Sequence, residues 1–257
     1  MNRYLRVENL SLSFAGVRAL DGVSLDVAKG ALFAVIGPNG AGKTSLFNCI
    51  SGVYRPQQGS VSLDGVILGE KRPHEIAALG VARMFQNTAL FENLTVLDNL
   101  LVGRHHLYTP TFWSNLVWWP STRKAEVAHR KRAEEIIDFL DLAKYRKTFV
   151  QVLPYGVRKR VELGRALCME PRLLLLDEPT AGLNQEETEE MARYLLDIKS
   201  ELGVTQLLIE HELRFVFDLA ERVAVLDFGK KIAEGTPEEV RVDPAVIEAY
   251  IGGEQAS

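Results

Sequence analysis

The chain has little cysteine and no long apolar run. Its two cysteines, Cys49 and Cys168, show no CxxC spacing, which argues against a disulfide framework or a zinc site and fits a reducing compartment. No run approaches the roughly 18 apolar residues of a membrane span, and the first residues contain no apolar segment of the signal-peptide kind. We therefore expect the protein to reach a membrane only by binding a partner.

The sequence also lacks an excess of charge of either sign, an internal repeat and a low-complexity linker. Its formal net charge is −4, with 25% charged and 47% hydrophobic residues over 257 positions. Such a chain has no general attraction for phosphate backbones, so nucleic acid is not an expected partner. The composition predicts a globular protein that forms one large domain or a core with a smaller lobe.

Hydrophobic periodicity predicts an α/β protein. Residues 5–32 alternate as short antiparallel strands do, residues 59–68 resemble a hairpin, and residues 92–146 are mainly helical in pattern. After residue 160, helices and apolar strands alternate, which indicates a parallel sheet wrapped by helices. Near the end, Thr236 precedes a proline and an acid at the spacing of a helix N-cap, so a short helix is predicted there.

The segment GPNGAGKT, from Gly37 to Thr44, matches the phosphate-loop pattern GxxxxGK(S/T). It stands between a predicted strand and a predicted helix, which is where such a loop works. Backbone N–H groups and the helix dipole would face phosphates, Lys43 would add a positive charge, and the Thr44 hydroxyl would bind magnesium. The alternative is a glycine turn that matches by chance, and the flanking strand and helix argue against it.

The segment LLLLDE, from Leu173 to Glu178, is a predicted buried strand that ends in two acidic residues. Acids at the carboxyl end of a strand in an α/β protein face the crevice where ligands bind. Asp177 would hold magnesium through water, and Glu178 would polarise the attacking water. The alternative is a strand that merely leaves the core at a polar turn. The phosphate loop in the same chain favours the catalytic interpretation.

Four further segments, LSFAG, RMFQN, AGLN and LLIEH, complete an order that resembles ABC-type nucleotide-binding subunits from near the first residue to the last. The resemblance implies that Phe14 stacks on adenine, that Gln86 reaches metal and water, and that His211 contacts the γ-phosphate. AGLN is similar to a loop that crosses a dimer, with Asn184 where aspartate is common. Taken singly, Gln86 could be a surface amide, His211 a strand-end histidine and Phe14 a core residue.

The resemblance implies ATP and Mg²⁺ as cofactors, with three groups of residues around them. The expected catalytic residues are Lys43, Gln86, Glu178 and His211. The expected metal site comprises Thr44, Gln86 and, through water, Asp177. The expected nucleotide-binding residues are Phe14, Gly37, Pro38, Asn39, Gly40, Ala41, Gly42, Lys43, Thr44, Ser45 and, acting on the nucleotide of a partner subunit, Gly156.

The segment LPYGVRKR, residues 153–160, departs from the family's signature LSGGQ, whose serine and glycines bind ATP held by the other subunit. Pro154 replaces the serine, Tyr155 a glycine and Val157 the glutamine, whereas Gly156 remains. Leucine before proline favours extended backbone and proline suits a first helical turn, so a helix is still predicted to start here. The lost hydroxyl would have given a charged hydrogen bond worth about 1.5 to 3 kcal/mol. We therefore expect the partner's site to turn over more slowly.

Within the family, the chain is most similar to the ATPase subunits of branched-chain amino acid importers. The pointers are LTVLDNLLVGRHH, the long insertion before residue 130, LLIEHELRFVFDLAERVAVLDFGKKIAEGTPEEV and the ending DPAVIEAYIGG. This resemblance implies a subunit that hydrolyses ATP and powers import by ATP-driven dimer closure. The implied partners are two membrane-spanning permease subunits and a second ATPase. The altered signature favours a heterodimer over a homodimer. The resemblance also implies a peripheral location on the cytoplasmic face of the inner or plasma membrane.

Other functions stay open at this point. A soluble ABC-type ATPase acting on nucleic acid or ribosomes would usually carry coiled-coil or zinc insertions, or two nucleotide domains, and the sequence contains none. A nucleotide-binding regulator without turnover would fit the altered signature, but the intact Glu178 and His211 argue against it. A transporter for another small polar solute, such as urea, is a further alternative, because solute selectivity lies in other subunits.

The expected architecture is a P-loop NTPase core of the ABC type with an N-terminal antiparallel β layer and an inserted α-helical subdomain. Residues 1–257 would form a single nucleotide-binding domain. Within it, residues 1–86 and 165–257 would form the α/β core lobe, and residues 87–164 the helical subdomain with the signature stretch. The subdomain follows Gln86 directly, so we expect it to dock the permease.

Two stretches of the insertion have competing interpretations. Four aromatic residues within ten positions would contact the permease or the bilayer interface, or else cover the subdomain's own core: Phe112, Trp113, Trp118 and Trp119. The basic stretch 121–132 would be a solvated helix face or would meet anionic lipid headgroups.

Overall fold

The protein is described by a computed structural model that covers residues 3–85, 90–107 and 120–254. Gln86 and the four aromatic residues at 112–119 lie outside the described residues. In the part of the chain that the structure covers, no helix is both long enough and apolar enough to cross a membrane.

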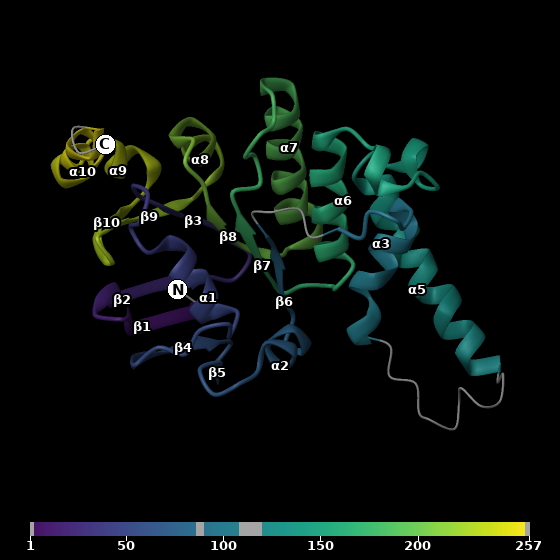
Figure 1. Cartoon of the computed structure of the whole chain (residues 1–257), viewed down its shortest axis with the longest axis horizontal. Coiled ribbons are helices and arrows are strands. Elements are labelled where there is room, and N and C mark those ends of the chain that lie inside the picture. Colours follow the sequence, from purple (N-terminus) through teal and green to yellow (C-terminus); the bar gives the residue numbers. More distant parts are fainter. Residues whose placement is uncertain (1–2, 86–89, 108–119, 255–257) are drawn as a thin grey trace.

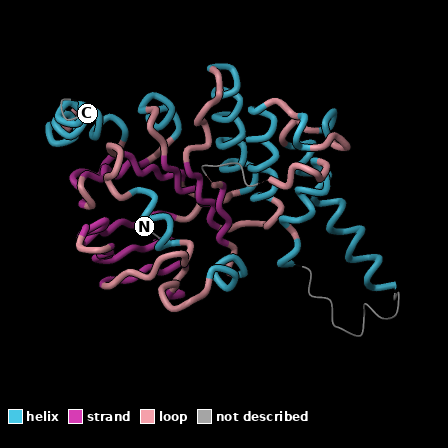
Figure 2. Tube along the Cα trace, in the orientation of Figure 1, coloured by secondary structure: helices cyan, strands magenta, loops and turns pink. Residues whose placement is uncertain are grey.

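An antiparallel sheet forms the N-terminal layer (Figures 1 and 2). Its strand order is β2-β1-β4-β5. The strands are β1 (Arg3–Phe14), β2 (Val17–Ala28), β4 (Gln58–Leu63) and β5 (Val66–Ile67). The alternating pattern of residues 5–32 and the hairpin at 59–68 predicted this layer, and both predictions are confirmed.

A second, larger sheet has the strand order β10-β9-β3-β8-β7-β6 and is parallel except for the β10–β9 pair. Every residue of β3, β7 and β8 is buried, as expected of parallel strands covered on both faces. The predicted α/β fold with a parallel sheet is therefore confirmed. The strands are β3 (Leu32–Ile36), β6 (Val81–Met84), β7 (Leu173–Asp177), β8 (Thr205–Ile209), β9 (Arg222–Asp227) and β10 (Lys230–Gly235).

Successive side chains of the central strands point to opposite faces, so the large sheet separates two apolar cores. In β3, Phe33 and Val35 join the core that the sheet shares with the antiparallel layer and with α1. Leu32, Ala34 and Ile36 join the core beneath the helices of the other face. Cys49 and Cys168 are both buried, one in each core.

The helices cover the large sheet and extend beyond its β6 edge, where Figure 1 shows α3 and α5. The insertion belongs to the same apolar core as the sheet, because Leu100, Ile136 and Leu174 share one cluster. The expected boundary between residues 164 and 165 falls inside α6. The α-helices are α1 (Lys43–Ile50), α2 (Pro73–Ala78), α3 (Val96–Gly103), α5 (Pro120–Phe139), α6 (Tyr155–Leu167), α7 (Gln185–Leu202), α8 (Leu213–Leu219), α9 (Pro237–Arg241) and α10 (Pro244–Glu254).

Some local predictions are confirmed in detail and some elements were not foreseen. Thr236 caps α9, with its hydroxyl accepting from the Glu239 N–H at 3.3 Å. On α5, basic residues of the 121–132 stretch pair with acids one turn away, as Arg130 does with Glu134, which agrees with a solvated helix face. The periodicity did not predict α2, β6, β10 or α10 as separate elements. Short turns of 3₁₀ helix occur at His105–Leu107, Ala143–Tyr145 and Val150–Val152.

Candidate active site

Three neighbouring strands bring the predicted site residues to one edge of the large sheet. β3 leads into the phosphate loop, β7 ends at Asp177, and β8 lies between them and leads to His211. The parallel register aligns their carboxyl ends, because Ile209 of β8 is opposite both Val35 of β3 and Asp177 of β7. This is the edge at which α/β sheets bind ligands.

The turn of the phosphate loop requires glycine at two positions. Gly37 has φ +145°, and a Cβ there would lie 2.0 Å from the carbonyl oxygen of Leu226. Gly42 has φ +101°, and its Cβ would lie 2.4 Å from the carbonyl oxygen of Ala19. No side chain caps α1 at Gly42, so the first N–H groups of the helix remain available to an anion.

Lys43 begins α1 and folds back over the loop. Its side chain is 5% exposed, and its ammonium donates to the carbonyl oxygens of Gly37 at 2.6 Å and Pro38 at 2.9 Å. Burial lowers the pKa of Lys43, while the nearby carboxylates of Glu178 and then Asp177 oppose that shift. Of the remaining loop positions, Asn39, Gly40 and Thr44 are exposed, Ser45 is half-buried and Ala41 is buried.

Asp177 ends β7 with a carboxylate that is 2% exposed. One oxygen, Oδ2, accepts from the guanidinium of Arg83 on β6 at 2.6 Å, and Arg83 also donates to Asn48 on α1 at 2.7 Å. The other oxygen, Oδ1, is buried without a hydrogen-bond partner. A buried carboxylate oxygen left unpaired is costly, so this atom fits the expected role of holding magnesium through water. Arg83 was not among the predicted site residues, and only the fold places it here.

Glu178 and His211 are in direct contact, with Oε1 of the carboxylate against Nε2 of the imidazole. Glu178 has a left-handed backbone, with φ +51°, and its N–H donates to the carbonyl oxygen of Ile209 at 2.9 Å. That bond ties the end of β7 to the end of β8. The structure thus brings together two predicted catalytic side chains that are 33 positions apart in the sequence.

The signature stretch starts a helix, as predicted. Leu153 is extended, Pro154 occupies the N-cap, and α6 begins at Tyr155. The Tyr155 hydroxyl donates to the carbonyl oxygen of Ala181, in the loop that follows Glu178, at 3.1 Å. Val157 is buried in the core and does not substitute for a polar signature residue. Gly156 is buried against the carboxylate of Glu187.

Two further residues singled out from the sequence, Phe14 and Asn184, make contacts outside the group formed by the phosphate loop, Asp177, Glu178 and His211. Phe14, at the end of β1, is 42% exposed and meets Tyr54 edge-on, with the ring centroids 5.0 Å apart. It is therefore not a core residue and presents an aromatic surface. Asn184 caps α7, because its side-chain oxygen accepts from the Glu187 N–H at 3.0 Å.

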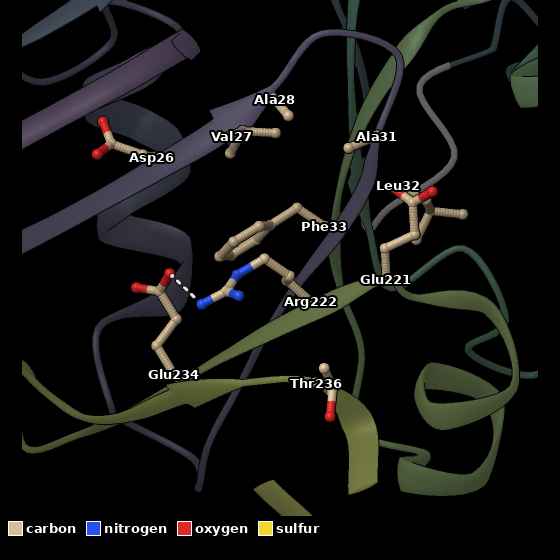
Figure 3. Close-up of a pocket in the computed structure, with 10 residues that line it drawn as sticks. All are labelled: Asp26, Val27, Ala28, Ala31, Leu32, Phe33, Glu221, Arg222, Glu234 and Thr236. Atoms are coloured by element: carbon tan, nitrogen blue, oxygen red, sulfur yellow. Dashed lines mark hydrogen bonds and ion pairs between the residues drawn. The ribbon is translucent and has the colours of Figure 1, made fainter. Parts of the chain in front are cut away.

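A cavity of about 810 Å³ lies elsewhere, at the amino ends of β3 and β9 (Figure 3). Its charged groups have partners: Arg222 donates to Glu234 at 3.3 Å, Lys199 donates to Glu221 at 2.5 Å, and Asp26 lies 3.8 Å from Arg6. The phosphate loop does not line the cavity, and the helix start that does, Thr236, is already capped by its own side chain. The carboxyl edge of the sheet is therefore the stronger candidate for a nucleotide.

Comparison with known proteins gives consistent family matches. Residues 20–181 match the family model described as ABC transporter, and residues 230–256 match the model described as branched-chain amino acid ATP-binding cassette transporter. The high-affinity branched-chain amino acid transport ATP-binding protein BraF of Pseudomonas aeruginosa is 39% identical over 248 residues, covering 96% of this chain and 97% of the relative. LivG of Escherichia coli K12, which carries the same functional description, is 37% identical with the same coverage.

Solved structures agree with these matches. A nucleotide-free ATP-binding cassette from an ABC transporter superposes with a TM-score of 0.84 at 34% identity, covering 97% of this chain and 99% of the other. The ADP conformation of an ATP-binding cassette superposes with a TM-score of 0.84 at 33% identity, covering 98% and 100%. Both chains have the same fold as this one over nearly its full length.

Proposed function

The chain belongs to the ABC transporter family of ATP-binding subunits, and from this we propose that it powers an importer of branched-chain amino acids. Members of the family bind nucleotide and hydrolyse ATP. The observation that carries the proposal is the meeting of the phosphate loop, Glu178 and His211 at one sheet edge. The C-terminal match at residues 230–256 and the names of the relatives supply the solute class. They favour a transporter over a nucleic-acid ATPase or a urea system.

In the proposed reaction, the protein positions the triphosphate and neutralises its charge. The phosphate loop from Gly37 to Ser45 would hold the phosphates, and Phe14 would stack on the base. Lys43 would leave its two carbonyl partners for phosphate oxygens. Thr44, Asp177 and Gln86 would hold magnesium, which when bound offsets charge on the phosphate oxygens.

Glu178 and His211 would act on the attacking water and the γ-phosphate. The Glu178 carboxylate would orient and polarise the attacking water, and His211 would donate a hydrogen bond to the γ-phosphate. Their mutual contact would hold the imidazole until nucleotide arrives. Glu178→Gln is then expected to retain ATP with little turnover.

A second subunit is needed to complete each site in this proposal. The chain carries one phosphate loop, and its α6 start, with Gly156, would face the nucleotide of the partner. Pro154 offers no hydroxyl, so we propose a heterodimer in which a second ATPase supplies a fuller signature. A homodimer is the alternative.

We further propose that residues 87–164 act as a helical subdomain that docks the permease, and that residues 1–86 and 165–257 act as the core lobe. Apolar side chains are exposed where the chain enters and leaves this subdomain, at Phe91, Phe149 and Val152. The two segments lie side by side, since the Gln151 N–H donates to the Glu92 carbonyl oxygen at 3.2 Å. Such exposed apolar groups suit a contact with a membrane subunit, which would keep the protein at the membrane.

The test is transport by the assembled complex. Proteoliposomes that hold this subunit, the second ATPase and the two permease subunits are expected to take up labelled leucine only with ATP, given the solute-binding protein. Lys43→Ala and Glu178→Gln should abolish uptake, and excess valine should compete while excess urea should not. Uptake that urea competes away, or leucine uptake that survives Lys43→Ala, would refute the proposal.

A further inference from the structure

Glu210 is a buried carboxylate between the two strand ends that carry Glu178 and His211. It follows β8 directly and is 3% exposed. A buried carboxylate is retained only where hydrogen bonds or charges offset its lost hydration. The segment LLIEH was singled out for His211 and not for Glu210, so the contacts of Glu210 decide what it does.

The two carboxylate oxygens of Glu210 bind two different segments. Oε1 accepts from the backbone N–H of Thr180 at 2.9 Å and from the Thr180 hydroxyl. Oε2 accepts from the backbone N–H of His211 at 3.0 Å. The side chain of Glu210 thus bridges the loop after β7 to the backbone of His211.

Thr180 belongs to the turn that sets the direction of Glu178. The Ala181 N–H donates to the Glu178 carbonyl oxygen at 3.2 Å, which closes the turn around Pro179 and Thr180. Glu178 itself has φ +51°, a conformation that residues other than glycine keep only when their surroundings enforce it. The bond from Glu210 to Thr180 is one such constraint.

A buried lysine lies near Glu210. Lys159 of α6 is fully buried nearby, and burial lowers its pKa, while Glu162 and then Glu210 oppose that shift. Within the described residues, the hydrogen bonds of Glu210 go to Thr180 and His211.

We propose that Glu210 is a positioning residue that fixes the separation between the Glu178 carboxylate and the His211 imidazole. It acts through the Thr180 turn on one side and through the His211 backbone on the other. The inference rests on the proposed roles of Glu178 and His211 in hydrolysis. It adds a residue that sets their geometry without meeting substrate.

The test is Glu210→Gln in the assembled transporter. The amide oxygen can still accept from Thr180, but the amide nitrogen cannot accept from the His211 N–H. We expect kcat to fall on the order of 10- to 100-fold, as for a small misplacement of reacting groups. The KM for ATP should change less than about threefold, because the phosphate loop is untouched. Glu212→Gln makes the same chemical change on an exposed side chain two positions later, and should leave kcat unchanged.

A second variant keeps the test valid if Glu210→Gln folds poorly. Thr180→Val retains the shape of the side chain but removes the hydroxyl that donates to Glu210. It should also lower kcat. The fold-loss of kcat in the double variant should be smaller than the product of the two single fold-losses, because each variant breaks the same bridge at one of its two ends. Thr180→Ser should restore turnover.

The outcomes separate this inference from the proposed function. If Glu178→Gln and His211→Ala abolish turnover while Glu210→Gln leaves kcat within about twofold, the positioning role is wrong and the proposed function stands. The positioning role would also be wrong if Glu210→Gln changed kcat and the KM for ATP together and its effect simply multiplied with that of Thr180→Val. Such a result would indicate a general loss of structure. If the wild-type complex does not hydrolyse ATP, the proposed function itself fails.

Discussion

At the scale of single residues, the phosphate loop depends on one buried cation. The Lys43 ammonium has exchanged water for the carbonyl oxygens of Gly37 and Pro38. Carbonyl dipoles replace hydration only in part, which is why burial lowers the pKa of Lys43 even though Glu178 and Asp177 oppose the shift. The phosphates of a nucleotide would supply full negative charge at the same place.

Nucleotide binding is therefore expected to take up protons in alkaline buffer. The pKa of Lys43 without nucleotide lies below its usual value, so part of the side chain is neutral as the pH rises towards it. Phosphates favour the ammonium and raise that pKa, so binding draws a proton and the affinity falls with increasing pH in this window. Calorimetry in buffers of different ionisation enthalpy measures the uptake. Lys43→Arg keeps a charge that does not titrate, so this variant should bind nucleotide without taking up a proton. Equal proton uptake by Lys43→Arg would contradict the assignment of the uptake to Lys43.

At the scale of elements, the starts of α6 and α7 are joined. The carboxylate of Glu187 closes the N-terminus of α7 by accepting from the Asn184 N–H at 3.1 Å. It also packs against Gly156, where a Cβ would lie 2.2 Å from Oε1. With Tyr155 bound to Ala181, the signature helix and the loop after Glu178 form one unit. These contacts hold the starts of α6 and α7 together.

Replacing Pro154 tests what the signature lacks. Pro154→Ser is expected to supply a hydroxyl for the partner's nucleotide while leaving α6 in place, because serine is a good N-cap residue. Turnover of the assembled transporter should rise by up to about tenfold for each 1.4 kcal/mol gained in the transition state. Steady-state ATPase rates measure it. Pro244→Ser, the same change at the start of α10, serves as the control; an equal rise there would show an effect unrelated to the signature.

Removing the α7 cap should weaken the fold at the proposed dimer loop. Asn184→Ala loses the acceptor for the Glu187 N–H and should lower the free energy of unfolding by about 1 kcal/mol. Asn184→Asp keeps an acceptor and should stay close to wild type. Denaturant unfolding monitored by circular dichroism compares the two. If both variants lose the same stability, the side-chain cap is not the cause.

At the scale of the whole molecule, the chain would contribute unequal halves to the two sites of the proposed dimer. Its own nucleotide edge would have the expected residue types from Lys43 to His211. The surface that would serve a partner begins at Pro154, whose cap makes no side-chain hydrogen bond. Two copies would therefore pair two complete edges with two reduced signatures.

The isolated chain is accordingly expected to be a slow ATPase. A missing charged hydrogen bond of at least 1.4 kcal/mol in each site corresponds to a rate about tenfold or more below that of the full complex. The measurement compares the ATPase rate per site of the purified chain with that of the transporter, with Glu178→Gln as the control for contaminating activity. A homodimer as fast as the complete transporter would refute the proposed heterodimer.

The sequence alone determined those features whose signal is local. The phosphate loop lies within eight contiguous residues, the α9 cap within four, and the strand and helix periods within single elements. The α/β fold, the antiparallel layer and the residues of the phosphate loop could therefore be predicted from local patterns. It missed α2, β6, β10 and α10, whose short or weakly periodic segments give little pattern of their own.

Only the tertiary structure decided how distant polar groups pair. Arg83 meets Asp177 across 94 positions, Thr180 meets Glu210 across 30, and Tyr155 meets Ala181 across 26. In each pair the partner is chosen by which strand or helix lies alongside, and a single sequence carries no local signal of that neighbour. Burial then makes the choice matter, because an unpaired charge beneath the surface costs far more than the same charge in water.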